Sequence, residues 1–489
     1  MMKSKLIGNK IEDNISLKTL FGFCFLFLIV NFFINLCMPF PFAKGLAWRI
    51  ILNIGYVLIF LVDLILIARC FRECKKILVC EVYKNKWILL FLAAYLIWDL
   101  INFIYADHFE YAAGKIMSMI EFFLILINFV LYTSWRDINK VFLCLGLTSL
   151  GISVVYLVGF LTGDYCFYLR KISALSDYNV SSTAILLGTI ANFYIATRNG
   201  IPMGKRLSLF FLNFVLNIPV VLLSGSRKNL VIICGLILFY VCVFLVKAIY
   251  QTQKKFCNDN RLKKRMLLVF TLIFTICSMG TMVFLLKSYS DNRYEQYLSG
   301  SYTWVRYGEH EQGDGEIIRE TDVKERYETI RSGESSNARM IIWKTSLNWI
   351  KEMSTLEKVI GGGNSHNSEI FDDLDHPINQ KCRVLYADVD DEEKNWLYPH
   401  NIVLGDMLDG GIIKIILLFG VILTMIFKVC KSIFYKSEMG FAVLWIGGTI
   451  LIMLMTSGSL GLFGNKFFWI PFSLTLGLEQ AKPEDAEGR

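Results

Sequence analysis

Charged residues and proline are scarce in this sequence. Charged side chains make up 19% of its 489 residues and prolines number 8, whereas 55% of the residues are hydrophobic and the mean hydropathy is +0.49. A typical soluble domain carries about 25% charged residues. The scarcity of charge excludes an ordinary soluble protein, and the 38 phenylalanines point in the same direction, towards an integral membrane protein.

Features that mark several other classes are also missing. No small-residue cleavage site follows the first apolar run, which starts just after Lys18, so we do not expect a cleaved signal peptide. No Lys-Ser or Lys-Thr pair follows the glycine run 361–363, which excludes a P-loop there. The sequence contains no internal repeat and no low-complexity tract. A single long array of membrane spans remains the simplest organisation.

Apolar runs near the length that crosses a bilayer, about 20 residues, recur along most of the chain. They predict an all-α polytopic membrane protein with about 12 transmembrane helices. The predicted spans are 17–37, 46–68, 87–105, 113–133, 141–162, 180–197, 207–223, 228–248, 267–287, 401–427, 440–457 and 462–478. Residues 1–287 thus hold nine helices, 288–400 form one large loop, 401–478 hold three helices, and 479–489 form a polar tail.

Charge is distributed unevenly between the loops. The loop 288–400 contains 22 acidic and 13 basic residues, a net charge of −9, whereas the whole chain carries +8. Lysine and arginine gather in alternate short loops, at 69–86, 136–140, 198–206, 254–265 and 428–436. Because cytoplasmic loops are the basic ones, we expect both termini in the cytoplasm and the acidic loop outside. This pattern of charge is not that of a nucleic-acid binder.

The large loop should contain one amphipathic helix, around Arg339–Glu352. Apolar residues fall there at mixed helical spacing, at Ala338, Ile341, Ile342, Leu347, Trp349 and Ile350. Glycines 361–363 and Pro377 should separate this helix from the remainder of the loop. Residues 306–334 are charged and poor in apolar side chains, so we expect a mobile flap there.

Two predicted spans begin at the outer surface with polar groups. Ser224-Gly225-Ser226-Arg227 precedes one, and Tyr398-Pro399-His400-Asn401 precedes another. A helix N-terminus offers free N–H groups and the positive end of the helix dipole, so an arginine beside it suits a phosphate or pyrophosphate. The alternative is that Arg227 and Lys228 only extend into the lipid headgroup region.

His400 is a candidate general base. A helix N-terminus disfavours the imidazolium form, so the ring should be neutral near pH 7 and able to accept a proton. The alternative is a capping or interfacial histidine without a chemical role.

Several short motifs follow one another on the predicted outer side. They are Arg170 to Asn179 with Asp177, SGSR-K at 224–228, Asn337-Ala338-Arg339 with Trp343, VIGGGNS at 359–365, His400-Asn401 and Gly410-Gly411. In this order, over residues 165–475, they resemble the bacterial O-antigen polymerase and ligase family. The resemblance implies a GT-C-like glycosyltransferase that uses glycans linked to polyprenyl pyrophosphate.

The resemblance also implies a set of site residues. Its catalytic residues are His400, Arg339 and Arg227, and its substrate-binding residues are Arg170, Asp177, Asn179, Ser226, Asn401 and Asp409. Members commonly have glutamate where this chain has Asp409, and residues 295–335 look like an insertion. No cofactor and no metal are expected. The expected location is the bacterial inner membrane. A chain-length regulator and a flippase are candidate partners beside the glycan donor and acceptor.

Other residues have two interpretations each. His366, Asp372, Asp373, Asp375 and His376 offer ligands for a metal, but a solvated acidic surface explains them equally simply. Asp63, Asp99 and Glu121 fall within predicted spans and should be paired or hydrated inside the bundle, with a cation-coupled pathway as the alternative. Cys166 and Cys382 are candidates for one disulfide, and free thiols are the simpler interpretation.

Two classes of function fit these observations. The first is a glycosyltransferase that polymerises undecaprenyl-pyrophosphate-linked repeats for O-antigen, capsule or exopolysaccharide, or that ligates them to a lipid A core. The second is a transporter, such as a flippase for the same lipid-linked repeat. The long outer loop with its arginine and histidine residues favours the enzyme, because flippases usually have short loops.

Overall fold

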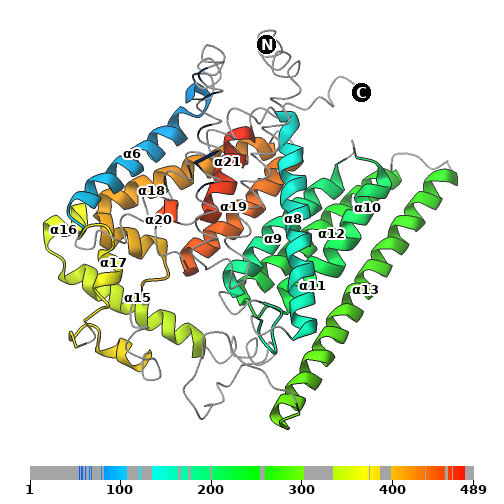
Figure 1. Ribbon diagram of the computed structural model, residues 1–489. Coiled ribbons are helices and arrows are strands. Elements are labelled where there is room, and N and C mark those ends of the chain that lie inside the picture. Colours follow the sequence, from blue (N-terminus) through cyan, green and yellow to red (C-terminus); the bar gives the residue numbers. More distant parts are fainter. Residues whose placement is uncertain are drawn as a thin grey trace. The chain divides into compact units, whose positions relative to one another are not determined.

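The computed structural model describes the chain in sections. These are residues 82–106, 135–163, 167–173, 178–198, 201–253, 259–301, 334–373, 375–385, 398–434, 437–457, 461–464 and 466–478, with scattered positions from 54 to 122. Every regular element in these sections is a helix (Figure 1). The protein is therefore all-helical in its described part, as predicted.

The helices divide between two compact units. The first unit contains α6 (Lys86–Ile104), α15 (Glu334–Glu352), α16 (Thr355–Ile360), α17 (His366–Glu369), η2 (Gln380–Leu385), α18 (Ile402–Phe434), α19 (Glu438–Ser457), α20 (Gly461–Gly464), η4 (Lys466–Phe468) and α21 (Trp469–Gly477). The second contains most of α8 (Trp135–Thr162), then α9 (Tyr178–Thr197), α10 (Met203–Leu212), the π-helix η1 (Asn213–Asn217), α11 (Ile218–Leu222), α12 (Arg227–Gln253) and α13 (Asp259–Leu298).

Seven helical stretches in the described sections are long and apolar enough to cross a membrane. They are Lys86–Ile104, Val141–Thr162, Tyr178–Thr197, Gly204–Leu222, Ile273–Leu298, Ile402–Phe434 and Glu438–Thr456. Each coincides with a predicted span, and α12 covers the span predicted at 228–248. The spans predicted at 17–37, 46–68 and 113–133 fall almost wholly outside the described residues. The chain is a membrane protein, and the total of 12 spans stays a prediction.

Three predicted boundaries are wrong. The span at 462–478 is not one helix, because the 3₁₀ segment η4 separates α20 from α21. Helix α13 continues to Leu298, past the loop boundary predicted at 288. Helix α18 continues to Phe434, so Lys428 is a buried helical residue instead of a loop residue. Hydropathy shows where the run of apolar side chains ends, whereas a helix ends where its backbone hydrogen bonds end, so the two boundaries can differ.

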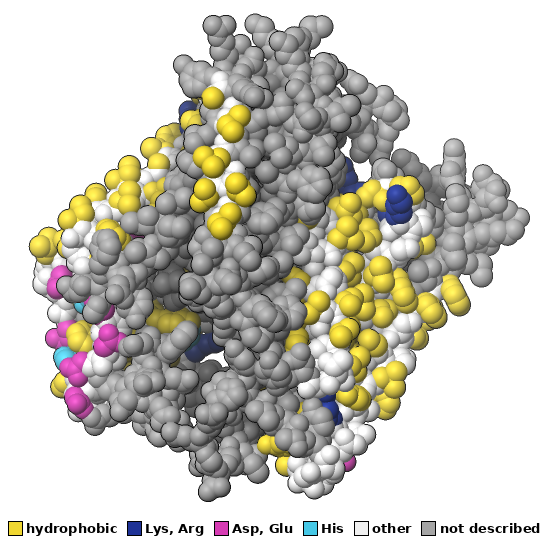
Figure 2. Space-filling model, viewed as in Figure 1, with side chains coloured by type: hydrophobic (Ala, Val, Ile, Leu, Met, Phe, Trp, Pro, Cys, Tyr) yellow, Lys and Arg dark blue, Asp and Glu magenta, His cyan; other side chains and the backbone are white. Residues whose placement is uncertain are grey.

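The first unit is built around α18. Helices α6 and α19 pack along it, and the short helices α15, α16 and α17 pack at its beginning. Gly411 has φ 65° and ψ −164°, which are not helical angles, so α18 consists of two helical parts joined by a kink. Figure 2 shows hydrophobic side chains along the exposed face of α6, where Trp87, Ile97 and Ile104 are more than half exposed, as expected of a surface that faces lipid.

The predicted loop helix is confirmed as α15, and its apolar side packs into a small core. Ile342, Met353, Phe371 and Cys382 are buried there, together with Leu408 from α18. The loop helices are therefore fixed to the first part of α18. Leu347 was expected on the apolar side but is 47% exposed.

The second unit surrounds α9, whose residues from Ser181 to Ile195 are all buried. Its neighbours α10, α11, α12 and η1 pack against it. The last part of α13 is attached to the same unit, since Tyr289 donates a hydrogen bond to the carbonyl of Leu161 (2.8 Å) and Arg293 donates one to the carbonyl of Phe160 (2.6 Å). These contacts explain why the helix extends into a segment that the sequence analysis assigned to the loop.

Candidate functional site

The chain makes a sharp turn at His400 before it enters α18. Asn401 caps the helix: its Oδ1 accepts hydrogen bonds from the N–H groups of Val403 (2.9 Å) and Leu404 (3.3 Å). His400 has φ 50°, a left-handed conformation that is uncommon outside glycine. Its ring centroid lies 3.9 Å from that of Tyr398. Asn401 therefore has a structural task, and its contact with substrate stays a prediction.

Helix α15 brings Arg339 towards this turn. The Trp343 indole donates a hydrogen bond to the carbonyl of Pro399 at 2.8 Å, and Arg339 lies one helical turn before Trp343. Burial, and then the positive charge of Arg339, lower the pKa of His400 to about 4. The ring is therefore neutral at pH 7, as predicted. The main cause is burial, whereas the sequence analysis had invoked the helix N-terminus.

The kink in α18 frees backbone carbonyl groups, and other segments bind them. Two N–H groups of the glycine run 361–363 donate to the carbonyls of Leu408 (2.8 Å) and Asp409 (3.0 Å). The Trp98 indole of α6 donates to the carbonyl of Gly410 at 2.8 Å. Unpaired carbonyls inside an apolar bundle are costly, so these three contacts stabilise the kink. They also bring together the two glycine motifs that the sequence analysis singled out.

The close approach of these segments requires glycine on both sides. A Cβ atom on Gly361 would lie 2.2 Å from the carbonyl oxygen of Asp409, and one on Gly411 would lie 2.4 Å from that of Val359. Both glycines have positive φ values, 87° and 65°. The glycine run therefore lets the backbone of the loop approach the backbone of α18.

Asp409 is fully buried and binds the loop. Its Oδ1 accepts the backbone N–H of Asn367 (2.9 Å), and its Oδ2 accepts the side-chain Nδ2 of the same residue (2.8 Å). The sequence analysis assigned Asp409 to substrate. In the structure its carboxylate holds the loop segment at the kink, and a substrate contact stays a prediction.

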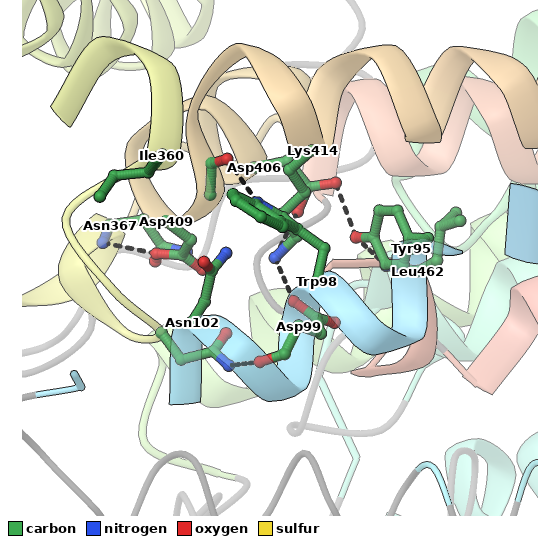
Figure 3. A network of polar contacts seen from close by, with 12 residues as sticks. Tyr95, Trp98, Asp99, Asn102, Ile360, Asn367, Asp406, Asp409, Lys414 and Leu462 are labelled. Atoms are coloured by element: carbon green, nitrogen blue, oxygen red, sulfur yellow. Dashed lines mark hydrogen bonds and ion pairs between the residues drawn. The ribbon is translucent and has the colours of Figure 1, made fainter. Parts of the chain in front are cut away.

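Three buried ions, Asp99, Asp406 and Lys414, lie beside the kink (Figure 3). Lys414 Nζ lies 2.5 Å from an oxygen of Asp99 in α6 and 3.3 Å from an oxygen of Asp406 in α18. Tyr95 donates a hydrogen bond to the other oxygen of Asp406 at 2.7 Å. All four side chains are buried. Asp99 is thus paired, which is the first of the two interpretations that its sequence context allowed.

Loop residues join the same region to the end of α6. Asn364 donates from its backbone to the carbonyl of Asn102 (3.1 Å) and from its side chain to the carbonyl of Asp99 (2.8 Å). Tyr105 donates to the carbonyl of Ile360 at 3.0 Å. The end of α6, the glycine run and the kink of α18 therefore form one polar junction, which we call the α6–α18 junction.

Two predicted substrate residues meet in the second unit. Ser226 donates a hydrogen bond to Oδ1 of Asn179 at 3.0 Å. One turn further, Asn229 donates to Ser182 (2.6 Å) and Thr183 (3.1 Å), so α9 and α12 are joined by neutral polar groups. Arg227 begins α12, at the helix N-terminus where the sequence analysis placed it.

Arg170 contacts an aromatic ring of the second unit. Its guanidinium carbon lies 4.0 Å from the ring centroid of Tyr294 in α13, a cation–π contact within the second unit. Asp177 lies outside the described residues. Arg227 and Arg170 belong to the second unit, whereas Arg339 and His400 belong to the first. The predicted convergence of Arg227 with the other two therefore stays a prediction.

The candidate metal and disulfide residues have other partners. Asp373 Oδ1 accepts hydrogen bonds from the N–H groups of Asp375 (3.0 Å) and His376 (3.2 Å), and the His376 ring stacks on Trp349 with centroids 4.4 Å apart. Cys382 is a buried free thiol 3.4 Å from the Thr345 hydroxyl. Asp63, Glu121 and Cys166 lie outside the described residues.

Sequence reasoning missed Lys414 and Asp406. Both stand within an apolar span, where a charge is costly and normally paired. The signal was present, since Lys414 interrupts an otherwise apolar run from Gly410 to Gly420. The pairing itself was not readable, because Asp99 lies on a helix more than three hundred residues earlier in the chain.

No family model matches the sequence, and no curated protein sequence matches it significantly. The family resemblance therefore stays a prediction.

Proposed function

We propose that this chain is a membrane glycosyltransferase that polymerises oligosaccharide repeats carried on undecaprenyl pyrophosphate, for O-antigen, capsule or exopolysaccharide. The observation that carries the proposal is the approach of α15 to the turn at His400. It puts a guanidinium group near a neutral imidazole at the beginning of a membrane helix. This pair suits a reaction in which a base takes a proton while a phosphate leaves.

The proposed reaction has one chemical step. His400 accepts the proton of an acceptor hydroxyl, whose oxygen forms a bond to the anomeric carbon of the donor. The bond from that carbon to the pyrophosphate oxygen breaks, and the electron pair leaves with the pyrophosphate. Attack from the opposite face inverts the anomeric carbon. General-base help of this kind contributes about 10²–10⁴ in rate.

Arg339 supports the leaving group in this proposal. Its charge offsets the negative charge that grows on the pyrophosphate, and Arg227 is its predicted partner. The same charge disfavours the imidazolium of His400 in the resting enzyme, so the imidazole stays neutral and able to accept a proton. The predicted orientation places the reaction at the outer leaflet of a bacterial inner membrane.

The test uses substitutions that preserve the backbone. Asparagine tolerates left-handed angles well, so His400→Asn removes the base without straining the turn. We expect cells that carry His400→Asn or Arg339→Gln as their only copy to lose long glycan ladders. The matched control is His376→Asn, which alters a loop histidine stacked on Trp349. Normal ladders with His400→Asn at wild-type protein levels would exclude the proposed base.

The nature of the product separates the related activities. A polymerase defect leaves single repeats on the outer side, and a ligase defect leaves long chains on the lipid carrier. Accumulation of repeats on the inner side identifies a flippase and would overturn the proposal.

A further inference from the structure

Lys414 and Asp406 lie on opposite sides of the kink in α18. A straight helix would separate them by about 12 Å along its axis, whereas the ammonium and the carboxylate are 3.3 Å apart. The non-helical residue Gly411 lies between them. The ion pair therefore favours the kinked form of the helix over a straight one.

We infer that Lys414 is a positioning residue, whose ammonium group braces the kink between Asp406 and Asp99 and thereby holds His400 in place. The catalytic value of this role rests on the proposed function. The brace itself is a property of the helix and is independent of what the protein acts on.

The brace is anchored on α6 at two points. Asp99 contacts Lys414 at 2.5 Å, and Tyr95 contacts Asp406 at 2.7 Å. The part of α18 before the kink is thus attached to α6 through Asp406, and the part after it through Lys414. A change in the angle between the two parts has to break at least one of these contacts.

The brace lies close to His400 along a short helix. Asp406 is six residues after His400, and the N–H of Gly405 already bonds the carbonyl of Asn401 at 2.9 Å. Any tilt of residues 402–410 therefore moves the turn at His400, together with the loop helices packed on this part of α18, with respect to α6, and changes how deeply the imidazole is buried. Because Arg339 and burial together keep His400 neutral, a released brace should let the imidazole take up a proton more easily.

The chain contains a matched control in Lys428. This lysine is also buried in α18, where it donates hydrogen bonds to Asn85 and to the carbonyl of Leu476 (2.9 Å). It lies 17 residues after Gly411, about 25 Å further along the helix, so it is too far from the part before the kink to brace it. A general need for a buried lysine in α18 predicts equal effects at both positions, whereas the brace predicts an effect at Lys414 only.

The experiment follows the titration of His400 in the full-length protein in lipid nanodiscs, by peptide-resolved carbethoxylation of histidines between pH 4 and pH 8. The main variant is Asp99→Asn/Asp406→Asn/Lys414→Met, which removes the three paired ions together, so that none of them is left buried without its partner, and leaves Asp409 with its hydrogen bonds to Asn367. We expect its His400 midpoint to rise from about 4 towards the ordinary 6.5, and its His400 to react several-fold faster at neutral pH. Lys428→Met should leave both unchanged.

Further variants keep the test decisive. Lys414→Arg, which preserves the charge, should keep the wild-type midpoint, and Asp406→Asn alone should raise it in part. His376 reports on general unfolding and should react as in the wild type. An unchanged His400 midpoint in the folded main variant, or in Asp406→Asn if the main variant does not fold, would overturn the brace. Because no glycan is needed, this result is independent of whether the chain transfers sugars.

Discussion

The polar side chains buried between α6 and α18 include the ions Asp99, Asp406 and Lys414, whereas those buried along α9 are neutral amides and hydroxyls. In the first unit, Lys414 forms ion pairs with both Asp99 and Asp406. In the second, Asn217 accepts from Ser153 (2.7 Å) and donates to Ser149 (3.0 Å). A buried ion that loses its partner is costly, whereas a neutral group that loses one partner keeps others. The first arrangement therefore fixes one geometry, and the second joins helices with less dependence on any single contact.

Lys414→Met tests the comparison with the largest expected effect. It leaves two carboxylates buried without their cation, which costs about 3–5 kcal/mol. We expect a large decrease in the free energy of unfolding in detergent, with partial recovery when Asp99→Asn and Asp406→Asn are added. If the single variant is no less stable than Lys428→Met, the ions do not fix the geometry of the first unit.

Asn217→Leu tests the neutral side of the comparison. Hydrogen bonds between membrane helices contribute on average about 0.6 kcal/mol and at most about 1.7 kcal/mol, and leucine has nearly the shape of asparagine. We expect a loss of that order in the same unfolding experiment. A loss as large as that of Lys414→Met would show that the two units do not differ in this respect.

Arg339→Gln has the smallest expected effect on stability, and it tests how the charge of Arg339 acts on His400. Burial is the larger cause of the low pKa of His400, so removing the charge should raise the pKa from about 4 only part of the way towards 6.5. A histidine whose pKa is lower when folded than when unfolded makes the protein less stable as the pH falls from 6.5 towards 4.

This variant should therefore lose less stability than the wild type over that pH range, measured as unfolding midpoints at pH 7 and pH 5. A loss as large as that of the wild type would mean that Arg339 does not act on His400.

The sequence predicts where the helices of this protein lie better than it predicts their interruptions and ends. Helix α15 was predictable because its apolar residues recur at helical spacing. The neutral state of His400 was predicted from its place before a helix, whereas its main cause is burial. The interruption at η4 and the π-helix η1 were not predictable, since both depend on how apolar segments pack against neighbours. The extension of α13 to Leu298 depends on Tyr289 and Arg293, whose partners lie on α8.

The candidate site shows the same division. Residues such as Arg339 and His400 stand out by type and by their place in the chain. The α6–α18 junction does not, because its contacts join positions near 100, 360 and 410. A single sequence contains no information on such distant pairs beyond the cost of each isolated charge.

The hydrogen-bond donors and acceptors at the kink of α18 are synthesised in a fixed order. Trp98 and the glycine run 361–363, which bind the carbonyls of Leu408 to Gly410, all precede α18 in the chain. A ribosome therefore completes every donor before it makes the acceptors. When α18 enters the membrane, the donors for the carbonyl groups freed by its kink have therefore already been synthesised. These hydrogen bonds can form without waiting for a later helix.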